Sequence, residues 1–225
     1  MITGIPGRLG RMAVAAVTLA ALAFAGSASA QDASAARPLR QAQAGAVTGF
    51  ASTGGRPREH VPSPQVIGPV AGGLHGRPFT SSPVPLGLAG YVQQEFFVKG
   101  TATGYRQVGT WGSNGRWTAR PAETAPYETR ILVRRPADPA HFNGTVVVEW
   151  LNVSFGIDVD PDFLYESQEL LRAGYAWVGV SAQQLGVQGA FGLTHWDPLR
   201  YHALHHPGDT FSYSIFSQAL SLIHI

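Results

Sequence analysis

Cysteine is absent from this sequence of 225 residues. Its absence excludes disulfides, cysteine-ligated metals and a thiol nucleophile, so the fold has to be stable through its core alone. Lysine is almost absent as well, because Lys99 is the one lysine among 16 basic residues. Together with abundant alanine, glycine and proline, this preference for arginine suggests a bacterial source with GC-rich DNA.

A long hydrophobic run is also missing, and the longest one lies within the first 30 residues. Arg8 and Arg11 form a basic start, an uncharged apolar stretch covers 12–24, and the Ala-Ser-Ala of 28–30 is a small-residue cleavage site. A membrane-spanning helix needs about 20 apolar residues, so no permanent membrane anchor is expected. Residues 1–30 are predicted to be a signal peptide, and the mature protein is expected to be secreted or periplasmic.

Charge of one sign is lacking once the signal peptide is removed. Its two arginines leave and no acid leaves with them, so 14 basic side chains remain against 14 acidic ones. A balanced chain has no electrostatic attraction for nucleic acid or anionic lipid. Nucleic acid is therefore not an expected partner.

The region that follows the signal peptide has little regular pattern. Residues 31–90 are rich in Ala, Gly, Pro, Ser and Arg and show neither strand nor helix periodicity, which predicts a largely irregular lead. Residues 91–99 are rich in strand formers, and Gly100 follows them. We predict a first strand over 91–99.

Alternating residues indicate a second strand over 127–134. Tyr127, Thr129, Ile131 and Val133 alternate with Glu128, Arg130 and Arg134, and this period of two is typical of a half-exposed strand. The face that carries the charged residues is expected to be partly wet.

A strand-helix-strand unit is predicted next. Residues 145–151 are almost continuously apolar and β-branched, which indicates a strand in the middle of a sheet, and 175–180 repeat the pattern. Between them, Asp160 is the expected N-cap of a helix over 161–173. Such crossovers join parallel strands, so we expect an α/β fold with a mostly parallel sheet and helices on both faces. A second helix is predicted to begin at Asp209 or Thr210.

The turn after the third strand, Asn152 to Gly156, is a candidate binding site. It lies at the carboxyl end of a parallel strand, where open α/β sheets place their ligand crevice. The backbone N–H groups of Asn152, Val153 and Ser154 are therefore oxyanion-hole candidates. The alternative is an ordinary loop in which the asparagine and serine side chains satisfy neighbouring backbone groups.

Ser181 is the nearest match to a nucleophile. Gly179-Val180-Ser181-Ala182-Gln183 follows a buried strand and differs from the nucleophile elbow G-x-S-x-G in its last residue. The elbow needs small residues around the serine and a helix directly after it, whereas a glycine-rich loop follows here. We therefore do not assign Ser181 as the nucleophile.

Four histidines crowd into twelve residues: His195, His202, His205 and His206. Such a tract sometimes binds zinc, but this spacing fits no standard zinc site and prolines and glycines interrupt it. We expect surface histidines, no metal and no cofactor.

Five blocks of sequence resemble the exported bacterial alpha/beta hydrolase domain proteins, over about 68–219. The blocks are 90–97, 127–136, 143–154, 174–183 and the His-Pro-Gly-Asp of 206–209. The resemblance implies that the first two strands lead the sheet and that Asn152 to Gly156 forms part of the oxyanion hole. It also implies that the nucleophile lies on a later strand and that the acid and histidine follow it, so none of the three falls on a position here.

The last six residues, 220–225, match the translation of an adapter used in DNA library preparation, and a non-native tail is expected there. The alternative is that 221–225 begins the next strand. On the first interpretation, 91–219 is the N-terminal part of a hydrolase domain that stops before its nucleophile strand and is itself inactive. The complete protein is expected to be a serine hydrolase of ester-like bonds in a small-molecule substrate. The competing hypothesis is an exported, non-catalytic binding module on the same fold.

Overall fold

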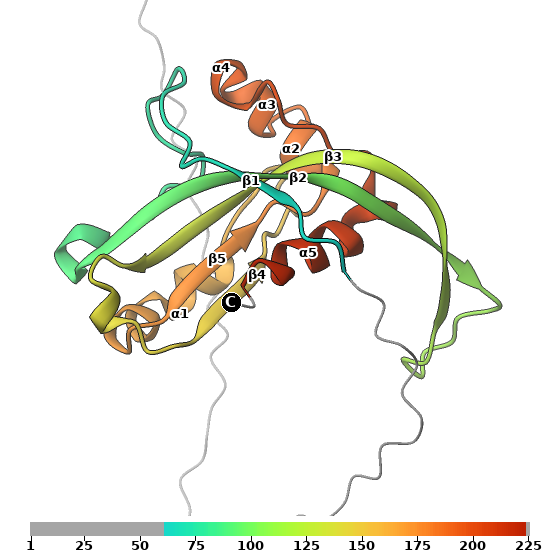
Figure 1. Ribbon diagram of the computed structural model, residues 1–225, viewed down its shortest axis with the longest axis horizontal. Helices are drawn as coiled ribbons and strands as arrows, with labels where there is room; N and C mark the ends of the chain where they lie inside the picture. Colours follow the sequence, from blue (N-terminus) through green and yellow to red (C-terminus); the bar gives the residue numbers. More distant parts are fainter. Residues whose placement is uncertain (1–60, 224–225) are drawn as a thin grey trace, which may run out of the picture. The chain divides into compact units, whose positions relative to one another are not determined.

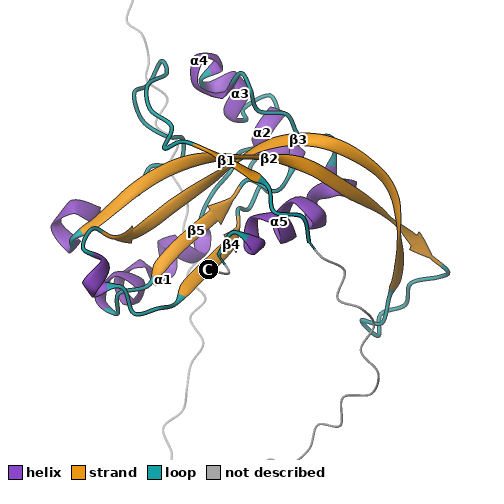
Figure 2. Cartoon of the chain, viewed as in Figure 1, coloured by secondary structure: helices purple, strands orange, loops and turns teal. Residues whose placement is uncertain are grey.

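The computed structural model describes residues 61–223, which form one five-stranded mixed sheet and its helices (Figures 1 and 2). The predicted signal peptide, residues 31–60 of the lead and the last two residues lie outside the described part. The strands are β1 (Gln65–Ile67), β2 (Tyr91–Val108), β3 (Thr118–Pro136), β4 (Val146–Trp150) and β5 (Ala176–Val180). The α-helices are α1 (Pro161–Arg172), α2 (Gln184–Gln188), α3 (Leu193–Trp196), α4 (Pro198–Tyr201) and α5 (Ser212–Ser221). The 3-10 turns are η1 (Leu86–Ala89), η2 (Pro139–His141) and η3 (Asp209–Phe211).

Most of the sheet is antiparallel, so the prediction of a mostly parallel sheet is wrong. In the order β1-β2-β3-β5-β4, only β4 and β5 run parallel, as the strand-helix-strand pattern predicted. The reason is connectivity, because β2 and β3 are joined by a direct hairpin and only β4 and β5 are joined by a helical crossover. The strand expected in the middle, β4, forms an edge of the described sheet, and β5 is the inner one.

The hairpin of β2 and β3 is much longer than the sequence predicted. β2 continues through Gly100 and Gly104, where glycine allows a close approach of the following helices. A Cβ at position 100 would lie 2.8 Å from Oε1 of Gln218, and one at position 104 would lie 3.2 Å from the ring of Phe211. We call the outer part of this hairpin, residues 100–126, the arm. Figure 1 shows it curving over α5.

Two prolines in β3 also caused the sequence to predict too short a strand for the arm. Pro121 lies opposite Tyr105 and Pro126 lies opposite Thr101 in the β2–β3 ladder. Proline cannot donate a ladder hydrogen bond and is tolerated where one side of the strand is unpaired. In the described part, β3 meets β5 only from Ile131 onward, so the proline segment has a neighbouring strand on one side only.

Helices cover both faces of the sheet, because alternate strand residues point to opposite sides. One cluster packs α5 residues Ile215 and Ala219 against Ile131 and Val178. On the other face, α1 packs through Phe163 against β3 and β5. A third cluster on that second face joins the following residues of β2, α2, α3 and α4: Phe97, Val187, Leu193 and Tyr201.

The start of α1 differs from the expected N-cap. The Asp160 side chain makes no cap hydrogen bond and instead pairs with Arg134. The helix is capped from β4, because the Glu149 carboxylate accepts from the N–H groups of Asp162 at 3.1 Å and Phe163 at 3.0 Å. A carboxylate at a helix N-terminus also interacts favourably with the helix dipole.

Glu149→Gln is expected to weaken the pH dependence of stability. Burial raises the pKa of Glu149 above its ordinary value of 4.5, although the two backbone donors oppose this. The folded state therefore holds a proton that the unfolded state has lost, and the free energy of unfolding falls as the pH rises from 4.5 through the raised pKa. Urea unfolding across this pH range should show a smaller fall in the variant. Glu169→Gln, which alters an exposed carboxylate of α1, is the control and should retain the parent slope.

Leu220 and Ser221 belong to α5 and residues 222–223 form a turn, so no strand begins within 221–223. In the part of the chain that the structure describes, no helix is long and apolar enough to cross a membrane.

Candidate functional site

The carboxyl ends of β4 and β5 lie side by side, and the loop after β4 begins there. Asn152 forms an antiparallel bridge with Val159, and its N–H donates to the Val159 carbonyl at 2.9 Å. The Ser154 N–H donates to Oδ1 of Asn152 at 2.8 Å. Two of the three oxyanion-hole candidates are thus engaged within the loop. Among the described residues, the Val153 N–H has no such bond, so it is the one candidate that the loop itself does not engage.

Ser181 follows β5 and is fully buried. Its hydroxyl donates to Oδ2 of Asp158 and accepts a hydrogen bond from Nε of Arg130 at 3.0 Å. A serine nucleophile needs a base that takes its proton and access to the substrate carbonyl. Ser181 has a carboxylate partner and no access to solvent, so its geometry is that of a structural serine.

Asp158, at the end of the same loop, is a buried carboxylate with an unusual environment. Its Oδ2 accepts from Nη2 of Arg130 at 2.9 Å, whereas Oδ1 has no hydrogen-bond partner among the described residues. Oδ1 is packed against Gly186 of α2, where a Cβ would lie only 1.9 Å away. Burial raises the pKa of Asp158, and Arg130 and Ser181 counteract that rise.

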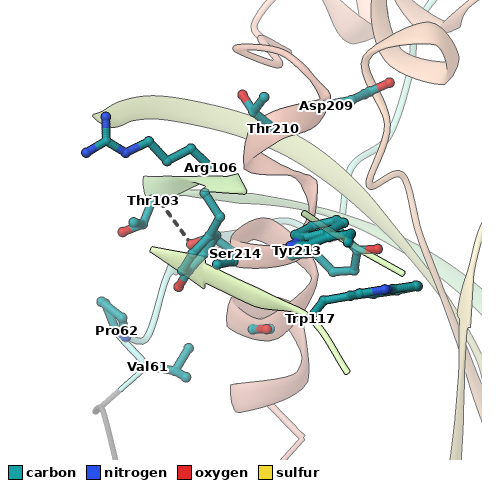
Figure 3. Close-up of a pocket in the computed structure, with 13 residues that line it drawn as sticks. Val61, Pro62, Thr103, Arg106, Trp117, Asp209, Thr210, Tyr213 and Ser214 are labelled. Atoms are coloured by element: carbon teal, nitrogen blue, oxygen red, sulfur yellow. Dashed lines mark hydrogen bonds between the residues drawn. The ribbon is translucent and has the colours of Figure 1, made fainter. Parts of the chain in front are cut away.

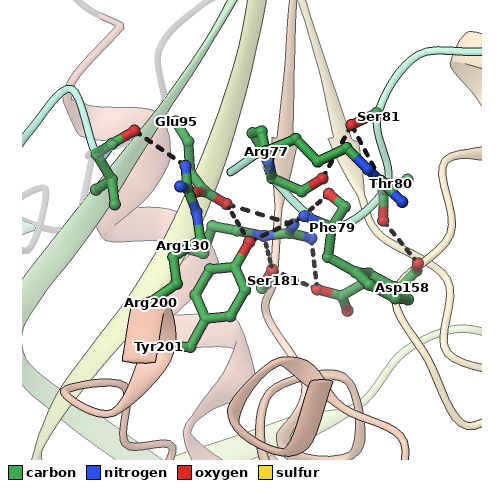
Figure 4. Close-up of polar contacts among 12 residues, drawn as sticks. Arg77, Phe79, Thr80, Ser81, Glu95, Arg130, Asp158, Ser181, Arg200 and Tyr201 are labelled. Atoms are coloured by element: carbon green, nitrogen blue, oxygen red, sulfur yellow. Dashed lines mark hydrogen bonds and ion pairs between the residues drawn. The ribbon is translucent and has the colours of Figure 1, made fainter. Parts of the chain in front are cut away.

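Arg130 is the centre of a buried polar cluster that continues away from Asp158 (Figure 4). Its Nη1 lies 3.6 Å from Oε1 of Glu95 on β2. Glu95 in turn accepts from Nε of Arg200 at 2.6 Å and from the Tyr201 hydroxyl at 2.8 Å. Burial alone would lower the pKa of Arg130, but the carboxylates of Asp158 and Glu95 raise it above its ordinary value. The arginine is therefore held in its charged form.

The expected wet face of β3 is in fact buried. Arg130 and Arg134 have no exposed side-chain surface. Arg134 lies over the rings of Phe163 and Trp177, at 4.0 and 4.4 Å from their centroids, and donates to Asp160. The alternation was identified correctly, but it cannot distinguish a solvated charged face from one whose charges are paired with distant residues. For this reason the buried cluster was not predicted from the sequence.

Residues 70–82 of the lead are attached to this cluster through their main chain. Arg130 Nη1 donates to the Phe79 carbonyl at 2.8 Å, and Arg134 Nη2 donates to the Thr80 carbonyl at 2.9 Å. Arg200 donates to the carbonyls of Gly72 and Val70. Thr80 has a positive φ of 60°, a costly conformation for a β-branched residue. The arginines thus fix the path of the lead over the sheet.

The histidines of the tract do not converge. His195, His202 and His205 are exposed, whereas His206 is buried. The His206 ring lies with Nε2 at 2.9 Å from the Ala182 carbonyl, and Nδ1 accepts from the Gly208 N–H, so both ring nitrogens have partners. Burial lowers the pKa of His206. Among residues 61–223 no group of three metal-binding side chains comes together, and the absence of a metal stays a prediction.

The parallel β4-α1-β5 unit and the loop at its carboxyl end are features of an α/β protein. The chain belongs to the alpha/beta hydrolase domain family, whose model matches residues 66–224. No curated protein and no solved structure matched the chain. The family membership supports a hydrolase in general, and it does not identify the bond that is cleaved.

Proposed function

We propose that the protein is an exported serine hydrolase that acts on an ester-like bond of a small molecule. Membership of the hydrolase family carries this proposal. The loop Asn152 to Gly156 supports it, because it lies at the carboxyl end of β4 beside β5, where such sheets bind ligands. The resemblance of residues 1–30 to a signal peptide supports export.

In this mechanism a serine oxygen attacks the ester carbonyl while a histidine takes its proton. The carbonyl oxygen becomes an oxyanion, the alcohol leaves with the proton, and water releases the acid in a second, equivalent step. The Val153 N–H is the donor of this chain that we assign to the oxyanion, where a single donor contributes about 3–4 kcal/mol. We assign none of the three catalytic side chains to residues 61–223.

Ser181→Ala is expected to leave ester turnover within about tenfold of the parent, or ~1.4 kcal/mol, because Ser181 is sealed between Asp158 and Arg130. The complete gene product is labelled with a fluorophosphonate probe and the adduct is located by peptide mapping. An adduct on another serine, together with turnover of a short aliphatic ester, supports the proposal. An adduct on Ser181 would show that the described part of the chain contains the nucleophile and that the assignment is wrong.

The second candidate is a non-catalytic binding module. The specific observation in its favour is that Ser181 and His206, a serine and a histidine close to the strand ends, are both fully engaged in buried hydrogen bonds. A complete gene product that neither reacts with the probe nor hydrolyses esters would favour this function over the hydrolase.

A further inference from the structure

A pocket of about 630 Å³ lies between the arm and the start of α5 (Figure 3). Its volume is within the range of small-molecule sites, about 300–1,000 Å³. Six of its lining residues carry the argument: Tyr105, Arg106, Trp111, Trp117, Asp209 and Tyr213. The two sides of the pocket come from segments that are far apart in the sequence, so folding of the arm over α5 creates it.

Two tryptophans of the arm are fixed in place without any ligand. Trp111 and Trp117 stack with their ring centroids 5.3 Å apart and an interplanar angle of 16°. Their indole N–H groups donate to the carbonyls of Thr118 at 3.0 Å and Gly112 at 2.7 Å. Trp117 is nevertheless 59% exposed. The arm therefore holds a large, rigid aromatic surface open to solvent.

The other side of the pocket adds a third exposed ring, because Tyr213 on α5 is 72% exposed. Figure 3 shows Trp117 of the arm and Tyr213 of α5 among the residues that line the pocket. Aromatic rings attract one another in offset or edge-to-face arrangements, at about 0.5–1.5 kcal/mol for each pair beyond the area buried. A flat ring entering this pocket meets stacking partners from both sides.

Two polar groups of the pocket lining are engaged in hydrogen bonds. The Thr103 N–H donates to Oγ of Ser214 at 3.0 Å, and Oδ1 of Asp209 accepts from the Gln184 N–H at 2.8 Å. A planar ring matches the aromatic side chains of the lining, and Arg106 is the one cation among the lining residues.

The pocket lies beside the carboxyl end of β4. Tyr213 packs edge-on against Trp150, the last residue of β4, with ring centroids 5.5 Å apart. Trp150 donates to Oε1 of Gln183 at 3.0 Å, and the next residue, Gln184, is the one that Asp209 holds. The lining residue Tyr213 thus contacts the carboxyl end of β4, and the lining residue Asp209 contacts the start of α2, which follows β5.

We propose that this pocket binds the planar aromatic ring of the substrate, stacked between Trp117 of the arm and Tyr213 of α5. That the bound molecule is a substrate rests on the proposed hydrolase function. The binding of an aromatic ring rests on the pocket alone and is tested without catalysis.

The test measures binding of 2-naphthol and of octanol to the complete gene product by isothermal titration calorimetry. Tyr213→Ala and Trp117→Ala are each expected to weaken 2-naphthol binding at least about tenfold. Tyr165→Ala is the matched control, because Tyr165 is another exposed helical tyrosine, 84% exposed on α1. It should bind 2-naphthol like the parent, and octanol should bind more weakly than 2-naphthol in the parent.

Absence of saturable 2-naphthol binding, equal weakening in the Tyr165 control, or octanol binding as tight as that of 2-naphthol would overturn the inference. Turnover of a short aliphatic ester is measured on the same samples. Turnover without 2-naphthol binding would contradict the aromatic pocket and leave the proposed hydrolase function standing. Binding without turnover would support the pocket and contradict the hydrolase function.

Discussion

Arg130→Met is expected to lower the free energy of unfolding by about 3–5 kcal/mol, the cost of leaving a buried ion partner uncompensated. The variant removes the cation that lies between Glu95 and Asp158, both of which are buried. Glu95 keeps Arg200 and Tyr201, but Asp158 keeps only the Ser181 hydroxyl. Because a domain of this size is stable by about 5–15 kcal/mol in total, the loss is a large share of the whole.

Urea unfolding of the variant measures this loss. Arg135→Met is the matched control, because Arg135 lies on the same strand and is only partly buried, with hydrogen bonds to Gln94. Its loss should stay below about 1 kcal/mol. Arg130→Lys keeps the charge without the fork of donors and should fall between the two. Equal stabilities of the Arg130 and Arg135 methionine variants would contradict the central role of the cluster.

Gly186→Ala is expected to destabilise the protein by about 1–3 kcal/mol or more, as overpacking of a rigid core does. The new Cβ would lie 1.9 Å from Oδ1 and 2.7 Å from Cγ of Asp158, and 3.0 Å from Cγ1 of Val153. The carboxylate has to move, and its bonds to Arg130 and Ser181 move with it. Since the Cβ also crowds Val153, the ester turnover that we propose for this protein should fall together with stability.

Thermal and urea unfolding report the effect on stability. Gly87→Ala is the control, because a Cβ at position 87 meets nothing within 4 Å and its φ is ordinary. A double-mutant cycle with Asp158→Ala isolates the clash: the alanine at 186 should cost much less when the carboxylate is absent. Unchanged cost in the two backgrounds would place the strain elsewhere.

The unit from β4 to β5 was predictable because its signals are local. Continuous apolar runs, a proline at the first helical position and Gly174 after the helix are all visible within 35 residues, and α1 begins at Pro161 as predicted. The parallel pairing then followed from chain connectivity. Strand order did not, because the insertion of β5 between β3 and β4 depends on packing between distant segments.

The length of the arm and the buried cluster escaped prediction for a similar reason. From neighbouring residues alone, Gly100 is predicted to end a strand. In the structure the strand continues, and the glycine leaves space for the side chain of Gln218, which is more than a hundred residues away in the sequence. Arg130 has the same pattern as a solvated arginine, and only the folded chain brings Glu95 and Asp158 to it. For the candidate site, the position of the loop was predictable from the sequence. Which of its N–H groups are already hydrogen-bonded within the loop was not predictable, because this depends on the bridge between Asn152 and Val159.

The attachment of residues 70–82 has a consequence for how this protein is able to vary in evolution. Arg130, Arg134 and Arg200 hold the segment mainly by its carbonyl groups, which every amino acid possesses. Exposed side chains of the segment such as Leu74 are therefore free to change while its path over the sheet is retained, whereas Val70 and Phe79 pack against the third cluster. The three arginines are not, because only their planar fork reaches a carboxylate and a carbonyl at the same time. Among relatives, the segment is expected to drift in sequence around a set of fixed arginines.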